Sequence, residues 1–249
     1  MATFEPNVYG RRPVLEAIRA GHAARVFIAR ETRAAPVLRE IDDAAREANV
    51  PVTTIARAEM DRVLANRNHQ GVAADYHEHD YATLDDILAV ANQSSDPGLV
   101  LMLDGVQDPG NVGSLLRSAE GAGVHGVILP KHRAAGVTPA VVRASAGAAE
   151  HLAIAQETNL TRTLQWFKKD AGYWVVGLDE DGDTPYDRID AARPLVVVVG
   201  GEGKGITRLV REACDLTVRL PMRGKVGSLN AAVAGAVLLY DIRRQRDAQ

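Results

Sequence analysis

LVLMLDGVQDPGNVGSLLRSAEGAG is the sequence of residues 99–123. It contains an apolar run, an Asp-Pro-Gly-Asn turn and a segment of helical periodicity. The apolar run does not alternate with polar residues, which is typical of a strand buried on both faces of a parallel sheet. The turn then places a helix directly after this strand. The stretch therefore predicts an α/β fold in which helices cover both faces of the sheet.

The same alternation of strands and helices continues to the end of the chain. Further strands are expected at residues 125–130, 151–155, 173–179, 194–200 and 216–220, and further helices at residues 138–147, 158–170, 206–214 and 228–245. A smaller α/β alternation occupies residues 7–77, and a polar segment with a Ser-Ser-Asp-Pro-Gly run follows it. That composition is typical of a linker or a linker helix. We therefore expect a small α/β domain at residues 1–77, a linker at 78–97 and a larger domain at 98–249.

The composition is that of a globular protein. The chain has 249 residues, of which 46% are hydrophobic and 24% charged. No apolar run reaches the roughly 18–20 residues that cross a bilayer, and the first residues lack the apolar centre of a signal peptide. The single Cys214 excludes an internal disulfide and a cysteine-based zinc site. We expect a soluble, cytoplasmic protein without membrane contact.

The helix that follows the Asp-Pro-Gly-Asn turn has one small and polar face. At 100° per residue, this face contains Asn111, Ser114, Arg117, Ser118 and Gly121. Open α/β folds bind their ligands at the carboxyl ends of strands, where this helix begins. A solvated helix face has the same pattern, so spacing alone leaves both interpretations open.

A second motif, PLVVVVGGEGKGI, occupies residues 194–206. Its glycines allow backbone groups to approach a ligand closely, and the start of the next helix favours anions. The dinucleotide fingerprint requires glycine where Ile206 stands, and a phosphate-binding loop requires glycine where Val198 stands. The loop thus fits neither standard motif. It is either a site for a nucleotide-like ligand or a tight turn.

A third motif, LPMRGKVGSLN, occupies residues 220–230 and leads into AAVAGAVLL at residues 231–239. Ser228 is a candidate N-cap of the last helix, with Leu229 and Asn230 in its first turn, and it is equally a candidate site residue. The helix is small or apolar on every side, which predicts burial against the domain or a second subunit.

The segment His77-Glu78-His79-Asp80 contains residue types that bind metals. No third histidine lies nearby in the sequence, so we expect these side chains to be solvated. We predict no metal site.

Together the three motifs NVGSLLR, GGEGKGI and LPMRGKVGSLN resemble, in order and in strand–loop–helix context, the signature motifs of the SpoU (TrmH-like) branch of the SPOUT RNA methyltransferases. Near the front, YGRRPVLEAIRAG and RNHQGVAADY resemble the RNA-binding domain of the RlmB type of 23S ribosomal RNA guanosine 2′-O-methyltransferases. The resemblance covers nearly the whole chain.

This resemblance implies a trefoil-knotted α/β methyltransferase domain with a mostly parallel sheet, preceded by a small L30e-like α/β domain that binds RNA. It also implies a homodimer that binds S-adenosylmethionine in the knot. The implied substrate is 23S ribosomal RNA or a large-subunit assembly intermediate, and the implied reaction is 2′-O-ribose methylation of a guanosine. The net charge of −3 requires that RNA binding depend on local arginine patches and on shape.

The motif match also implies the functional residues. Those for catalysis are Asn111, Arg117, Glu202, Ser228 and Asn230. Those for the cofactor are Gly200, Gly201, Ile206, Leu220, Met222, Ser228 and Leu229. The guanidinium of Arg117 has no acceptor with which to take a proton. Our hypothesis is that it clamps the target phosphate and stabilises the alkoxide charge that develops on the ribose.

Three alternatives remain open. The first is a methyltransferase of the same family that acts on a transfer RNA ribose or another ribosomal RNA nucleotide. The second is a non-catalytic RNA-binding or ribosome-assembly protein. The third, a dehydrogenase-like nucleotide enzyme, is weakened by the failed glycine spacing.

Overall fold

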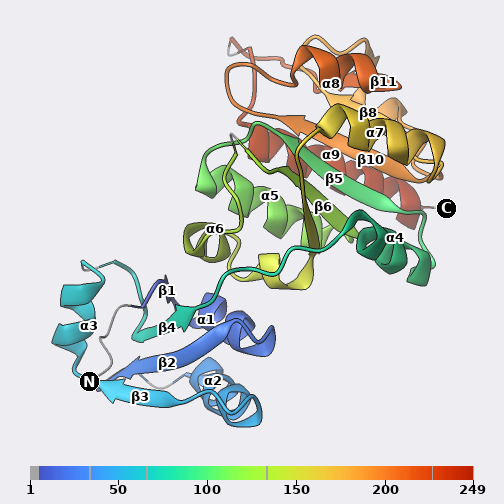
Figure 1. Cartoon of the computed structure of the whole chain (residues 1–249). Coiled ribbons are helices and arrows are strands. Elements are labelled where there is room, and N and C mark those ends of the chain that lie inside the picture. Colours follow the sequence, from blue (N-terminus) through green and yellow to red (C-terminus); the bar gives the residue numbers. More distant parts are fainter. Residues whose placement is uncertain (1–5, 34, 66, 133, 226, 249) are drawn as a thin grey trace. The chain divides into compact units, whose positions relative to one another are not determined.

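The computed structural model describes residues 6–33, 35–65, 67–132, 134–225 and 227–248 (Figure 1). These residues form two compact units. The first contains the described residues of Met1–Asp80 together with Val137–His151, and the second contains those of Tyr81–Gly136 and Leu152–Gln249. A segment from within the expected larger domain thus packs with the smaller one.

The first unit contains a four-stranded sheet with the order β1-β4-β2-β3. Its elements are β1 (Val8–Tyr9), α1 (Arg11–Arg19), β2 (Ala23–Ala29), α2 (Pro36–Glu47), β3 (Val52–Ile55), α3 (Arg57–Val63), β4 (Val72–Tyr76), α6 (Pro139–Ala144) and η1 (Ala148–His151). Strand β4 is antiparallel to β1 and β2, whereas β2 and β3 are parallel. The pattern at residues 9–21 predicts only a helix, because a strand as short as β1 carries no periodicity.

Helix α1 forms the centre of this unit. Its apolar side chains Val14, Leu15 and Ile18 are fully buried, and each side chain of this size contributes roughly 1.5–3 kcal/mol by leaving water. The segment from α6 to η1 packs tightly on the same unit, because a Cβ on Gly147 would lie 2.7 Å from the Cβ of Glu16. The guanidinium of Arg143 also stacks over the ring of Tyr9 at 4.2 Å.

The second unit contains a seven-stranded sheet with the order β7-β6-β5-β10-β8-β11-β9. Its elements are α4 (Leu84–Gln93), β5 (Leu99–Asp104), α5 (Pro109–Gly121), β6 (Gly126–Pro130), β7 (Ala153–Glu157), α7 (Leu160–Lys169), β8 (Trp174–Leu178), β9 (Thr184–Pro185), η2 (Tyr186–Arg188), β10 (Leu195–Gly200), α8 (Arg208–Ala213), β11 (Leu216–Arg219) and α9 (Ala231–Asp247). Every pair of named strands in this sheet is parallel within the described part of the chain. The α/β fold with a mostly parallel sheet is confirmed.

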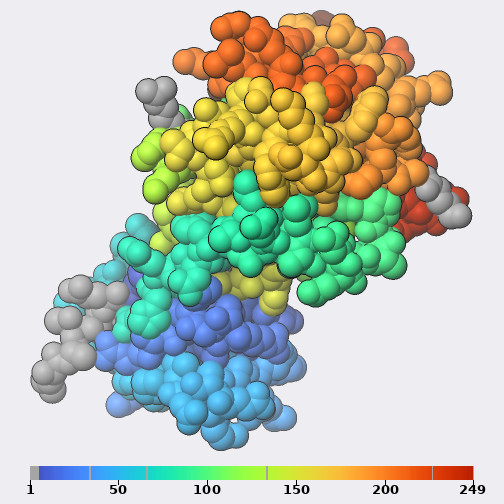
Figure 2. All heavy atoms as spheres, turned by 45° about the vertical axis from the view of Figure 1, so that its right-hand side comes forward, coloured from blue at the N-terminus to red at the C-terminus, as the bar shows by residue number. Residues whose placement is uncertain are grey.

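Helices cover both faces of this sheet, as expected. Helices α4, α7 and α8 share one apolar core with the strands, and Phe167 of α7 is fully buried in it. Figure 2 shows the yellow residues of α7 on this face, between α4 and the orange residues around α8. Helix α9 packs on the other face beside α5, where a Cβ on Gly235 would lie 2.5 Å from Leu115 and 3.3 Å from Val199.

Part of the expected linker is a packed helix. Thr83 and Asp86 form a capping box at the start of α4, and Ile87 is fully buried. A Cβ on Gly126 of β6 would lie 2.5 Å from Ile87, so this helix lies against the sheet at close range. None of the described helices is both long enough and apolar enough to cross a membrane.

The start of the last helix differs from the expectation. Helix α9 begins at Ala231, and its N-cap is Asn230, whose Oδ1 accepts from the backbone N–H groups of Ala232 at 3.0 Å and Val233 at 3.3 Å. The prediction that Ser228 caps this helix is therefore wrong. Asparagine caps helices as well as serine does, so residue type alone could not choose between two candidates only two positions apart.

Within the single chain, α9 is buried on one side only, and burial of the other side against a second subunit stays a prediction. Its inner face, with Leu238 and Leu239, is fully buried, but Val233, Val237 and Tyr240 are exposed. Threading of the C-terminal segment into a trefoil knot stays a prediction.

Candidate active site

Three side chains from the three sequence motifs meet at the carboxyl ends of β5 and β10. The amide Nδ2 of Asn111 donates to Glu202 Oε1 at 2.9 Å. The amide Nδ2 of Asn230 donates to Glu202 Oε1 and to Asn111 Oδ1, both at 2.9 Å. These contacts form a closed triangle, which we call the polar triangle. It joins the start of α5, the loop after β10 and the start of α9.

Helix caps hold the backbone of Asn111 and the side-chain amide of Asn230. Asp108 caps α5 by accepting from the backbone N–H of Asn111 at 2.8 Å, and Pro109 occupies the first helical position. The Oδ1 of Asn230 is engaged in capping α9, so its Nδ2 must point towards Glu202. Local capping therefore determines how the triangle assembles.

Residues 200–206, which we call the glycine loop, fold back tightly at the end of β10. The N–H of Gly201 donates to Asp104 O at 2.9 Å, and the N–H of Gly205 donates to Gly201 O at 3.0 Å. A Cβ on Gly200 would lie 2.1 Å from the carbonyl carbon of Gly205, and one on Gly201 would lie 2.3 Å from Gly105 O. Only glycine fits at Gly200 and Gly201, because the atoms in the way are backbone.

Asp104 is a positioning residue that the sequence analysis missed. It is the last residue of β5 and is buried. Its Oδ2 accepts from the backbone N–H of Thr207, the N-cap of α8, at 2.6 Å. The carboxylate thus ties the far end of the glycine loop to β5. The signal that could have identified Asp104 is its position, because it is an acidic residue at the end of an otherwise apolar, buried strand.

Arg117 lies on the polar face of α5. The expected face is confirmed as the solvent side: Ser114, Arg117 and Gly121 are exposed, whereas Leu115 and Leu116 are buried. Within the described part of the chain, the guanidinium of Arg117 makes no hydrogen bond or ion pair. It is therefore available to an anionic ligand.

The residues expected to hold a cofactor lie at the same edge of the sheet. Val199 and Val218 both pair with Leu178, so β10, which ends at Gly200, and β11, which Leu220 follows, are two strand spacings, about 10 Å, apart. The side chain of Ile206 is buried in the core, which leaves only its backbone for a ligand.

The remaining cofactor candidates are accessible. Met222, Ser228 and Leu229 are exposed, and Leu229 directly precedes Asn230 of the polar triangle. Their contact with a cofactor stays a prediction.

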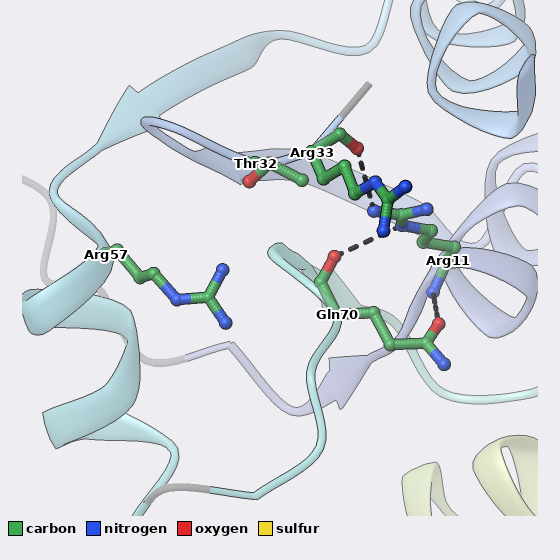
Figure 3. Close-up of a pocket in the computed structure, with 5 residues that line it drawn as sticks. All are labelled: Arg11, Thr32, Arg33, Arg57 and Gln70. Carbon is green, nitrogen blue, oxygen red and sulfur yellow. Dashed lines mark hydrogen bonds between the residues drawn. The ribbon is translucent and has the colours of Figure 1, made fainter. Parts of the chain in front are cut away.

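The first unit contains a separate pocket of about 360 Å³ (Figure 3). Its lining residues are Arg11, Thr32, Arg33, Arg57 and Gln70, so it contains three arginines and no acid. Arg11 holds the walls together, because its Nε donates to Gln70 O at 3.2 Å and its Nη2 donates to Arg33 O at 3.1 Å. Such a pocket suits a phosphate group.

The second unit has a glycine loop and a polar triangle at the end of a parallel sheet, and the first unit has an arginine-lined pocket. This combination suits an enzyme that modifies nucleic acid. The chain belongs to the SpoU rRNA methylase family, whose model matches residues 98–240. The model for RNA 2′-O ribose methyltransferase substrate binding matches residues 7–82. The resemblance to this family is thereby confirmed, and the protein is an RNA methyltransferase of the SpoU family.

Known relatives match along nearly the whole chain. A protein of Mycolicibacterium vanbaalenii, described as an uncharacterized tRNA/rRNA methyltransferase, is 47% identical over 241 residues, which cover 96% of this chain and 76% of the relative. Among solved structures, the SpoU methyltransferase AviRb from Streptomyces viridochromogenes in complex with AdoMet has a TM-score of 0.78 and 29% identity, and the match covers 97% of this chain and 90% of that one. The AdoMet-bound rRNA methyltransferase from Sinorhizobium meliloti, with a TM-score of 0.75 and 24% identity over 96% of this chain and 86% of that one, shares the fold.

Substitution of Gly200 tests the packing of the glycine loop. We expect Gly200→Ala to lower the free energy of unfolding by about 1–3 kcal/mol, because the new methyl group overlaps the backbone at Gly205. Urea denaturation of the full chain measures this. Gly224→Ala is the control, since a Cβ there meets no atom within 4 Å. Equal stability of the two variants would contradict the tight loop.

Proposed function

We propose that this protein transfers a methyl group from S-adenosylmethionine to a ribose 2′-hydroxyl of ribosomal RNA, with a 23S guanosine as the target, as in the RlmB type. The polar triangle is the observation that carries the proposal, because it brings all three motifs together at the start of α5, the helix that also carries Arg117. In this proposal residues 98–249 form the methyltransferase domain and residues 1–77 bind RNA, in the cytoplasm.

The glycine loop fits the cofactor. Gly203 and Gly205, with φ values of 79° and 59°, are exposed, and a Cβ at either position would meet no atom within 4 Å, so a ligand can approach the backbone there. Gly200 and Gly201 hold the fold of the loop, and the exposed side chains of Met222 and Leu229 offer apolar contacts to an adenine ring. When bound, the cofactor supplies an activated methyl group on a sulfonium.

The other site residues orient the ribose. Methyl transfer is an in-line displacement, and alignment alone can contribute roughly 7–11 kcal/mol to such a reaction. Asn111 and Asn230, fixed by helix caps and by Glu202, position the sugar together with Ser228. Arg117 contacts the target phosphate and stabilises the negative charge that develops on the 2′-oxygen.

Two observations extend the proposal to partners. The arginine pocket of the first unit offers a binding site for the RNA backbone. Leu229 and three residues of α9, Val233, Val237 and Tyr240, are exposed by 42%, 49%, 39% and 52%, and they form an apolar stripe that a second copy covers in a homodimer. The stripe begins at the polar triangle, so dimer contact would also order the start of α9.

Replacement of Arg117 tests the mechanism. We expect Arg117→Ala and Arg117→Lys each to lower kcat by about 10²–10³, because a fixed donor to the developing oxyanion is lost. Binding of S-adenosylmethionine, measured by calorimetry, should persist in both. Ribose methylation of 23S ribosomal and transfer RNA is mapped for each variant and for Arg162→Ala, an exposed arginine of α7 that serves as control. Near-normal turnover of Arg117→Ala, or methylation of transfer RNA alone, would contradict the proposal.

The arginine pocket predicts a salt-dependent loss of RNA affinity. In the double variant Arg33→Ala/Arg57→Ala, the slope of log K against log[salt] should become shallower by about 1–2, because two phosphate contacts disappear. Arg11 is retained because it holds the pocket walls. The control is Arg39→Ala/Arg62→Ala, which removes two exposed arginines of α2 and α3. An unchanged slope in the pocket variant would exclude the pocket from RNA binding.

The stripe on α9 predicts the oligomeric state. Light scattering during gel filtration should give the mass of two chains for the wild type and of one chain for Val237→Arg, because a charge in an apolar interface is costly to bury. Leu209→Arg, at an apolar position on α8 that is more exposed than Val237, should remain a dimer. A monomeric wild type would refute the homodimer.

A further inference from the structure

Two histidines and a glutamate meet in the first unit, away from the polar triangle. His22 precedes β2, His79 follows β4 and Glu150 lies in η1, and their ligand atoms all lie within 4.8 Å of one another. The Nδ1 of His22 is 2.6 Å from Glu150 Oε2, and the Nδ1 of His79 is 4.0 Å from the same oxygen. Three distant parts of the sequence therefore place imidazole and carboxylate groups together.

These side chains are shielded from water. Their exposed fractions are 15% for His22, 5% for His79 and 0% for Glu150. The expectation that His79 is solvated is therefore wrong. It depended on the lack of a third histidine nearby in the sequence, and the fold supplies one, His22, from 57 positions earlier.

One buried oxygen of the cluster lacks a partner. Among the residues that the structure describes, Glu150 Oε1 makes no hydrogen bond, although it is inaccessible to solvent. A buried carboxylate oxygen without a donor is costly, and such an atom in a folded protein indicates a missing water or ion.

We propose that His22, His79 and Glu150 bind one Zn²⁺ ion. Two imidazoles and a carboxylate are a preferred donor set for zinc, and water completes a tetrahedron. With bonds of about 2.0–2.1 Å, ligand atoms lie roughly 3.3 Å apart, which small side-chain rotations reach from the present arrangement. Asp80 Oδ2, 3.8 Å from the Nε2 of His22, is placed to accept from the other ring nitrogen, as acids do beside zinc-bound histidines.

The burial of the ligands indicates a structural ion. It joins the turn before β2, the end of β4 and η1, and so fixes the segment Val137–His151 on the first unit. Without metal, the contact between His22 and Glu150 holds the same segment less firmly. The protein therefore folds in both forms, and zinc binding is measurable on the full chain.

Metal content tests the site directly. The untagged full chain, stripped with chelator, receives equimolar Zn²⁺, passes a desalting column and is measured by plasma mass spectrometry. We expect about one zinc per wild-type chain, and a loss of at least tenfold in His79→Ala and in Glu150→Gln. His77→Ala is the matched control, because His77 is exposed and lies two residues from His79; it should retain the metal.

Thermal unfolding gives a second measurement that does not depend on methyl transfer. A free Zn²⁺ concentration about 100 times Kd should raise Tm by roughly 5–10 °C in the wild type and in His77→Ala, with reversal by chelator. His79→Ala should show no shift. If Glu150→Gln fails to fold, His79→Ala decides the result. Equal zinc content in wild type and His79→Ala, or an unchanged wild-type Tm, would overturn the proposal and identify a metal-free hydrogen-bonded cluster.

Discussion

The hydrogen bonds among Asn111, Glu202 and Asn230 are the constraint on which the candidate active site depends. They connect residues that are 91 and 28 positions apart in the sequence. Each of the three loops would otherwise be an independent surface turn, with its backbone free to move. Because the triangle is anchored by caps on α5 and α9, the rigidity of two helices extends into the site.

The glycine loop can contact a ligand with few polar side chains of its own. Its shape is set by backbone hydrogen bonds and by the carboxylate of Asp104, and any larger residue at Gly200 would collide with the chain itself. The loop can therefore present its own peptide groups to a ligand. Specificity then comes from which N–H and C=O groups face outward rather than from a set of polar side chains.

Much of the fold could be predicted from the sequence, because its strands are continuous apolar runs between helices with clear periodicity. The short strands β1 and β9 could not, since two residues carry no pattern. The resemblance implied Asn111, Glu202 and Asn230 as site residues, and in the structure their side chains meet. Sequence motifs could not reveal that Asp104 binds the backbone of Thr207 or that His22 lies beside His79. Both contacts join residues that are far apart in the sequence, and residue spacing carries no information on them.

The segment Val137–His151 makes the chain pass between the two compact units three times. A unit built from one continuous stretch of sequence could be cut out at its ends, whereas the first unit is completed by residues that lie in the middle of the stretch matched by the SpoU methylase model. A chimera joined near residue 80 would therefore combine α1 of one protein with η1 of another, across the close contact between Gly147 and Glu16.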